Sequence, residues 1–160
     1  MRYITSTMSS PSSRSPRNVV VWTVACTVVA LVAGRQFTAA PRAQGAGTIW
    51  DGIYTAAQAD KGKMLYADQC AVCHGDMAEG GPNAPALSGN DFMVDFNGSA
   101  MGELFNRIAQ TMPANDPGSL KPPDTAAIIA YIGRVNMWPA GQKELPADAD
   151  ALKNIKITKK

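Results

Sequence analysis

The stretch Cys70-Ala71-Val72-Cys73-His74 contains two of the three cysteines and the only histidine of the 160-residue chain. Two thiols separated by two residues and followed directly by a histidine are typical of covalent haem attachment. In such a site the two vinyl groups of the haem form thioether bonds to Cys70 and Cys73, and His74 is presented to the iron as an axial ligand. The motif therefore predicts one covalently bound haem c.

Two alternative interpretations of the motif fit the chain less well. A structural zinc site needs four nitrogen or sulfur ligands, and no Cys or His follows His74. A thiol–disulfide motif usually lies between a strand and a helix, and the flanking sequence shows no such context. Haem attachment is the favoured interpretation, with zinc binding and thiol–disulfide exchange as the alternatives.

An apolar run at residues 19–34 precedes the motif. Arg14 and Arg17 come before this run, and small residues follow it as far as residues 43–45. This order is typical of a secretory signal peptide, so we expect residues 1–45 to be one, with cleavage after residue 45. The alternative is an uncleaved N-terminal anchor, although the run is slightly shorter than the roughly 20 residues of a spanning helix.

The charge is divided unevenly along the chain. Residues 1–45 hold five of the 15 basic residues and none of the 13 acidic ones, so residues 46–160 carry 10 basic and 13 acidic residues, a net charge of −3. We expect no nucleic-acid partner, because binding to phosphates needs a basic surface. The basic residues near the C-terminus are Lys153, Lys156, Lys159 and Lys160.

Hydrophobic periodicity predicts three helices after the leader and no convincing strand, and therefore an all-α fold. The first helix begins after Thr55, with Gln58 placed to complete a capping box. The second begins near Ser99 and ends before Met112-Pro113. The third has Asp124 as its N-cap. Its apolar residues are expected to form one stripe, made of Ile128, Ile129, Tyr131, Ile132 and Val135.

Gly62, Tyr66 and Cys70 recur every fourth residue and so share one face of the first helix. Glycine inside a helix costs about 1 kcal/mol relative to alanine, which indicates a close helix crossing at Gly62. Residues 75–98 are rich in Gly, Pro, Asn and Asp and are expected to form a long loop that covers one face of the cofactor. Residues 141–160 are expected to be a C-terminal extension, either packed loosely or extended.

The second axial position of the iron decides between an electron carrier and a ligand-binding haem. Met112 is the predicted ligand because it lies just past a helix, in a loop that prolines stiffen, and Met93 is the main alternative. A ligating histidine usually donates its other ring N–H to a carbonyl or carboxylate, and Pro85 lies at a suitable loop distance. The sequence alone leaves Pro85 open between this role and an ordinary turn. After the leader the methionines are Met64, Met77, Met93, Met101, Met112 and Met137.

Taken together, these features resemble the class I cytochrome c family. The resemblance implies a small class I cytochrome c fold over residues 46–160, with three or more helices wrapped around one covalently attached haem c. It further implies that the Pro85 carbonyl accepts the His74 N–H and that Met112 is the second axial ligand. The residues that carry it are Gly62, Tyr66, Cys70, Cys73, His74, Pro85, Leu87, Gly89, Met112, Pro113 and residues 130–132.

The flanks at residues 50–55 and 138–145 are similar to those of bacterial periplasmic cytochromes associated with quinoprotein dehydrogenases. This resemblance implies a periplasmic one-electron carrier that is not itself an enzyme. Its expected partners are a quinoprotein dehydrogenase as donor and a terminal oxidase as acceptor, and it would contact the membrane only through an uncleaved leader. The alternatives are a haem c subunit of a membrane or periplasmic dehydrogenase or oxidase complex, and a gas-binding or peroxidase-like haem protein.

Overall fold

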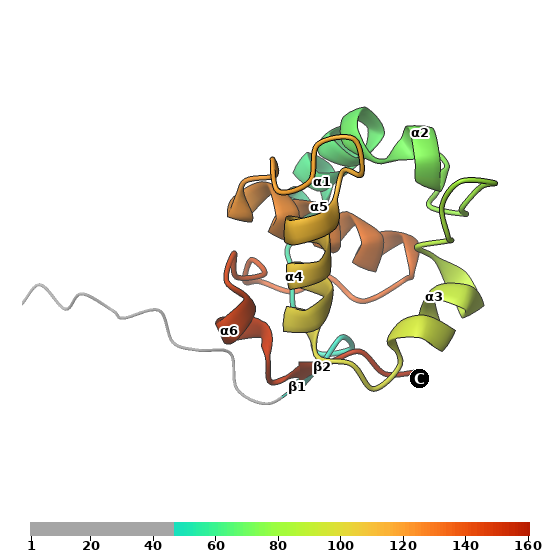
Figure 1. The fold of residues 1–160 in the computed structure, drawn as a ribbon. Coiled ribbons are helices and arrows are strands. Elements are labelled where there is room, and N and C mark those ends of the chain that lie inside the picture. Colours follow the sequence, from blue (N-terminus) through green and yellow to red (C-terminus); the bar gives the residue numbers. More distant parts are fainter. Residues whose placement is uncertain (1–46) are drawn as a thin grey trace, which may run out of the picture. The chain divides into compact units, whose positions relative to one another are not determined.

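The computed structural model describes residues 47–160, which are mostly helical, so the predicted all-α class is confirmed (Figure 1). Two strands of two residues each pair in parallel and join the two ends of this region. The sequence analysis missed both strands, because two residues are too few to show an alternating pattern. The elements are β1 (Gly47–Thr48), α1 (Ala56–Gln69), α2 (Ala71–His74), α3 (Gly89–Phe96), α4 (Met101–Thr111), α5 (Pro122–Val135), α6 (Ala149–Leu152) and β2 (Ile155–Lys156).

The predicted leader, residues 1–45, lies outside the described residues, together with Cys26 inside it. Its cleavage and its alternative role as an anchor therefore stay predictions. Within residues 47–160, no helix combines the length and the apolar character that crossing a membrane requires.

Helices α1 and α5 cross closely at Gly62. Gly62 is buried, and a Cβ atom at this position would collide with the carbonyl oxygen of Ala127. One turn further along α1, the ring of Tyr66 packs on that of Tyr131, with ring centroids 4.9 Å apart. The close crossing expected at Gly62 is therefore present.

Only one of the two hydrogen bonds of the expected capping box forms at the start of α1. The Thr55 side chain accepts the backbone N–H of Gln58, as predicted for an N-cap. The Gln58 side chain turns away from the cap: its Nε2 donates to the Leu145 carbonyl at 2.9 Å, and its Oε1 accepts the Leu145 N–H at 2.8 Å. Gln58 therefore fastens the C-terminal region to α1 instead of closing the box.

The prediction of an unbroken loop over residues 75–98 is wrong, because α3 forms inside it. Phe92 and Phe96 stand one turn apart on this helix, are both buried, and stack with centroids 4.8 Å apart. Gly89 begins the helix at φ +74°, a conformation that glycine adopts easily. The turn-forming residues at the start of α3 favoured a loop in the sequence analysis. The helix forms because it buries two aromatic rings.

Helix α4 begins at Met101, within two residues of the predicted start near Ser99, and ends before Met112 as predicted. Helix α5 begins earlier than expected. Its N-cap is Lys121, and Asp124 lies in the first turn. Proline suits the first helical position because its missing N–H has no partner there anyway, so the prolines at 122 and 123 belong to the helix.

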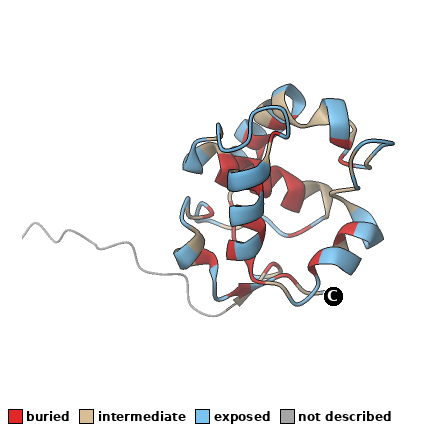
Figure 2. Cartoon of the chain, in the orientation of Figure 1, coloured by how far each residue is buried: buried red, intermediate tan, exposed pale blue. Residues whose placement is uncertain are grey.

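The prediction of a single apolar stripe on α5 is also wrong. Residues 125–133 are all buried, so every side of the helix is covered, and Val135 is only half-buried. Figure 2 shows the middle of this helix buried inside the domain. A helix that is buried on every side carries no amphipathic period from which its boundaries can be read.

Residues 141–160 contribute buried side chains to the core and are not a loose extension. Leu145, Leu152 and Ile157 are at most 2% exposed. The Trp50 indole N–H donates to the Thr158 carbonyl at 2.9 Å, which ties the entry of the domain to its exit. The C-terminal region therefore closes the base of the domain.

Replacing Gly62 with Ala tests the α1–α5 crossing. In an unhindered helix this change stabilises a protein by about 1 kcal/mol, because alanine is the better helix former. Here we expect a loss of about 1–3 kcal/mol, since the added methyl group must displace the Ala127 backbone. Urea unfolding of the haem-loaded protein measures the change, with Lys63→Ala on the exposed side of α1 as the control. A stabilised Gly62→Ala protein would contradict the crossing.

Candidate haem site

The predicted attachment motif forms a one-turn helix at the end of α1. Cys70 is both the C-cap of α1 and the N-cap of α2, and its carbonyl accepts the N–H groups of Cys73 at 3.1 Å and His74 at 3.0 Å. Cys70 is half-buried, Cys73 is exposed, and His74 is buried at 7% exposure. The turn thus presents two thiols beside one buried imidazole.

The imidazole of His74 is held by a single hydrogen bond to the backbone. Its Nδ1 lies 2.8 Å from the carbonyl oxygen of Pro85. A carbonyl oxygen only accepts, so Nδ1 carries the proton and donates, and Nε2 keeps its lone pair. This is the contact that the resemblance to class I cytochromes c implied for Pro85. It leaves Nε2 as the imidazole atom that can coordinate a metal.

Two tyrosines from the crossing helices fix the turn that follows His74. The Tyr66 hydroxyl donates to the Gly75 carbonyl at 2.9 Å, and the Tyr131 hydroxyl donates to the Asp76 carbonyl at 3.2 Å. Burial raises the pKa of the Tyr66 hydroxyl well above its usual range, so it remains a proton donor throughout the neutral range. The sequence analysis placed Tyr66 on the same helix face as Gly62 and did not predict these hydrogen bonds.

Asn136 also supports the site, and the sequence analysis did not predict its role. Its Nδ2 donates to the carbonyls of Leu87 and Ile132, both at 2.9 Å, and its Oδ1 accepts the Gly89 N–H at 3.0 Å. The loop that carries Pro85 is therefore fastened to the end of α5. A single asparagine just beyond a helix gives no sequence signal for contacts with a segment almost 50 residues away.

The two motif cysteines are free thiols in the described structure. Burial, and to a smaller extent the neighbouring Cys73 thiol, raise the pKa of the Cys70 thiol to about 11. Before haem attachment Cys70 is therefore a protonated thiol at neutral pH. Once it forms a thioether, it has no proton to titrate.

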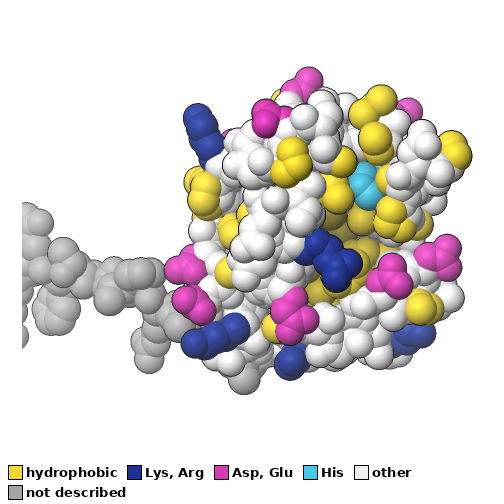
Figure 3. All heavy atoms as spheres, viewed as in Figure 1, with side chains coloured by type: hydrophobic (Ala, Val, Ile, Leu, Met, Phe, Trp, Pro, Cys, Tyr) yellow, Lys and Arg dark blue, Asp and Glu magenta, His cyan; other side chains and the backbone are white. Residues whose placement is uncertain are grey.

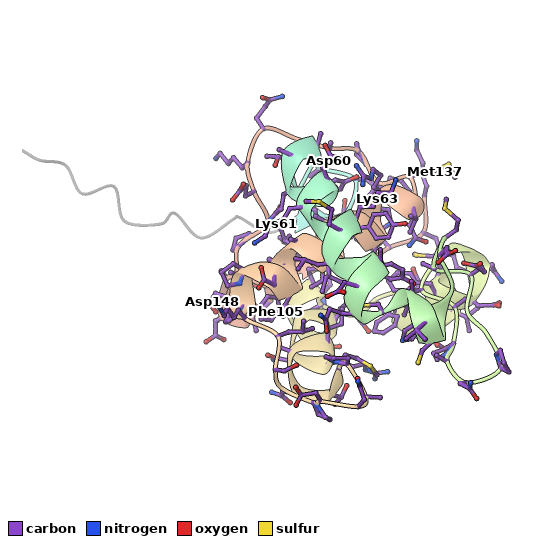
Figure 4. All side chains as sticks on the ribbon, turned by 90° about the horizontal axis from the view of Figure 1, so that it is seen from above. Asp60, Lys61, Lys63, Phe105, Met137 and Asp148 are labelled. Atoms are coloured by element: carbon purple, nitrogen blue, oxygen red, sulfur yellow. The ribbon has the colours of Figure 1, made fainter. Side chains whose placement is uncertain are left out.

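The burial of the methionine side chains reduces the number of candidates for the second iron ligand. Met64, Met77 and Met137 are 69%, 65% and 84% exposed, and Met137 points outward in Figure 4. Met101 is fully buried in α4. The two candidates named from the sequence, Met93 and Met112, are the ones that are partly buried and pack against the core.

The residues present fit haem c. Figure 3 shows the histidine (cyan) at the wall of a hollow lined by hydrophobic side chains (yellow). The donor set consists of one imidazole nitrogen with a free lone pair, two thiols on the adjacent turn, and a partly buried thioether at Met112 or Met93. Covalent attachment of haem c uses this combination of groups.

Comparisons with known proteins agree with this chemistry. Residues 57–132 match the family model described as cytochrome C oxidase, cbb3-type, subunit III. The thiosulfate dehydrogenase of Stutzerimonas stutzeri is 41% identical over 81 residues, which cover 45% of this chain and 25% of the relative. The cbb3-type cytochrome c oxidase subunit FixP of a Bradyrhizobium strain is 27% identical over 92 residues, which cover 51% of this chain and 32% of the relative.

The chain therefore spans about a quarter to a third of the length of these relatives. Among solved structures, the sulfane dehydrogenase SoxCD of Paracoccus pantotrophus is similar, at 25% identity and a TM-score of 0.45. That match covers 79% of this chain and 68% of the other chain.

Replacing Asn136 with Ala tests its role as the anchor of the Pro85 loop. The change removes the partners of the Leu87 carbonyl and the Gly89 N–H, so we expect a loss of about 1–3 kcal/mol. Guanidinium unfolding of the haem-loaded protein measures the loss, and faster hydrogen exchange at the Gly89 amide locates it. Asn106→Ala on the exposed side of α4 is the control and should change stability by less than about 0.5 kcal/mol. Equal effects of the two substitutions would exclude the anchoring role.

Proposed function

We propose that this chain is a cytochrome c domain that binds haem c covalently and acts as a periplasmic one-electron carrier, with His74 and Met112 as axial iron ligands. In this proposal Cys70 and Cys73 form the two thioethers. The bound haem supplies the redox chemistry, by exchanging one electron at its iron. The polypeptide supplies ligands, orientation and a dry, mostly apolar surrounding.

The observation that carries the proposal is the 2.8 Å hydrogen bond from His74 Nδ1 to the Pro85 carbonyl. It fixes the tautomer and the orientation of the ring, and it makes Nε2 a stronger electron donor. The Pro85 carbonyl is itself held in place, because the Leu87 N–H donates to the Ala78 carbonyl at 2.8 Å and Asn136 accepts the Gly89 N–H. A ligand held this firmly needs little rearrangement when the iron changes its charge.

The surroundings of Met112 favour it over Met93 as the second ligand. Met112 is the C-cap of α4, and its N–H donates to the Ile108 carbonyl at 3.0 Å. The following loop is braced by the bond from the Asp116 N–H to the Pro113 carbonyl at 2.9 Å. Met112 is therefore fixed between two long helices, whereas Met93 lies on the eight-residue α3. A thioether is a weak ligand and benefits from such a fixed position.

The exposed part of the motif gives a route for electron exchange with a partner protein. Val72 is 90% exposed, and Cys73 beside it is exposed as well. A haem joined to Cys73 would bring its thioether edge to this surface. We propose that partners dock here, with a dehydrogenase as electron donor and a terminal oxidase as acceptor. The quinoprotein class of the donor rests on the resemblance of the flanking sequences.

Replacing Met112 with Ala tests the ligand assignment. We expect the oxidised protein to lose its sulfur-to-iron charge-transfer band and the reduced protein to bind carbon monoxide, because one axial position becomes open. Absorption spectra of both oxidation states measure these changes. Met137→Ala, which removes an exposed methionine, is the control and should match the unaltered protein.

The same spectra separate the competing functions. Loss of the band in Met93→Ala, with Met112→Ala unchanged, would transfer the ligand role to Met93. Rapid carbon monoxide binding by the unaltered protein would instead favour the gas-binding or peroxidase-like alternative. A partner that co-purifies in fixed stoichiometry would favour a haem subunit of a larger complex.

A further inference from the structure

Arg107 reaches across the hollow from α4 to α3. Its guanidinium carbon lies 5.2 Å from the centroid of the Phe96 ring at the end of α3. Figure 3 shows a basic side chain (dark blue) over the hydrophobic floor of the hollow. A guanidinium stacks well on an aromatic face, and such a contact holds the charge at a defined place.

The guanidinium of Arg107 has no acidic partner within residues 47–160. The ion pairs in this region join Lys61 to Asp124 and Arg134 to Asp60. Glu103, one turn earlier on α4, forms no ion pair with Arg107. Arg134 provides a comparison. Its guanidinium also lies over an aromatic ring, that of Tyr131, but it forms an ion pair with Asp60. The hollow thus contains a fixed cation whose charge the protein does not balance.

The direction of the haem follows from the place of its attachment. A porphyrin of this type carries its two vinyl groups and its two carboxylates on opposite edges. Attachment at Cys70 and Cys73 keeps the vinyl edge at α2. In Figure 1, α2 and the C-terminal end of α3, where Phe96 lies, are at opposite ends of the space beside α4. The carboxylate edge should therefore face the end of the hollow where Phe96 lies.

We propose that Arg107 binds a haem carboxylate, an inference that rests on the proposed covalent haem site. A guanidinium matches a carboxylate with two parallel N–H···O hydrogen bonds, which makes arginine better suited to this role than lysine. The pair would fix the free end of the haem, opposite its thioethers. The positive charge of Arg107 would stabilise the reduced form of the haem, because reduction adds one electron to the iron.

Redox titration of the haem-loaded protein tests the proposal with three variants. In Arg107→Gln we expect a lower midpoint potential and a shift of the haem carboxylate bending band in the resonance Raman spectrum. Arg107→Lys keeps the charge and should recover part of the potential, but not the band. Arg134→Gln removes the same charge from an arginine that is already paired with Asp60, and should leave the band unchanged.

Two results would overturn the inference: an unmoved carboxylate band in Arg107→Gln, or equal band shifts in Arg107→Gln and Arg134→Gln. Because Arg107 is exposed, its substitutions should fold normally, and Arg107→Lys provides a second reading if Arg107→Gln does not. A protein without any covalent haem would show no redox wave at all. That outcome would overturn both the inference and the proposed function, whereas an intact wave with unaltered properties would overturn the inference alone.

Discussion

The close approach of α1 and α5 at Gly62 is the constraint on which the site depends. Only a residue without a side chain lets the backbone of α1 lie against the Ala127 carbonyl. That approach brings Tyr66 onto Tyr131, and both hydroxyls reach the turn directly after His74. The same helix α5 ends at Asn136, which fastens the loop on the other side of Pro85. The orientation of one imidazole is thus set by the packing of two helices.

The segment between α2 and α3 has little regular structure, yet its position is well defined by hydrogen bonds. The Gly80 N–H donates to the His74 carbonyl at 2.8 Å, and the Gly81 N–H donates to the Ala84 carbonyl at 2.9 Å. Gly80 adopts φ +84°, and a Cβ there would come within 2.6 Å of the Ala86 nitrogen. Such a compact loop positions a backbone carbonyl as accurately as a helix positions a side chain. A role for Pro85 through its carbonyl needs this accuracy, because it uses no side-chain atom.

Local signals in the sequence predicted what depends on local chemistry. The motif with its two thiols and histidine, the glycine at Gly62 and the N-cap at Thr55 could all be recognised from spacing or residue type. Features that depend on distant partners could not. Helix α3 is stabilised by the burial of Phe92 and Phe96, and residues 141–160 by contacts with α1 and the first strand. The hydrogen bonds of Asn136 and Gln58 join segments about 50 and almost 90 residues apart.

The covalent haem is tested most directly by the mass of one tryptic peptide from the purified protein. Residues 64–107 contain both motif cysteines and no internal Lys or Arg, so trypsin should release them as a single fragment. We expect this peptide to carry the mass of one haem and to resist alkylation by iodoacetamide, because both thiols are thioethers. A peptide of unmodified mass that gains two alkyl groups would show free thiols at Cys70 and Cys73. It would contradict the haem site on which the proposed electron transfer depends.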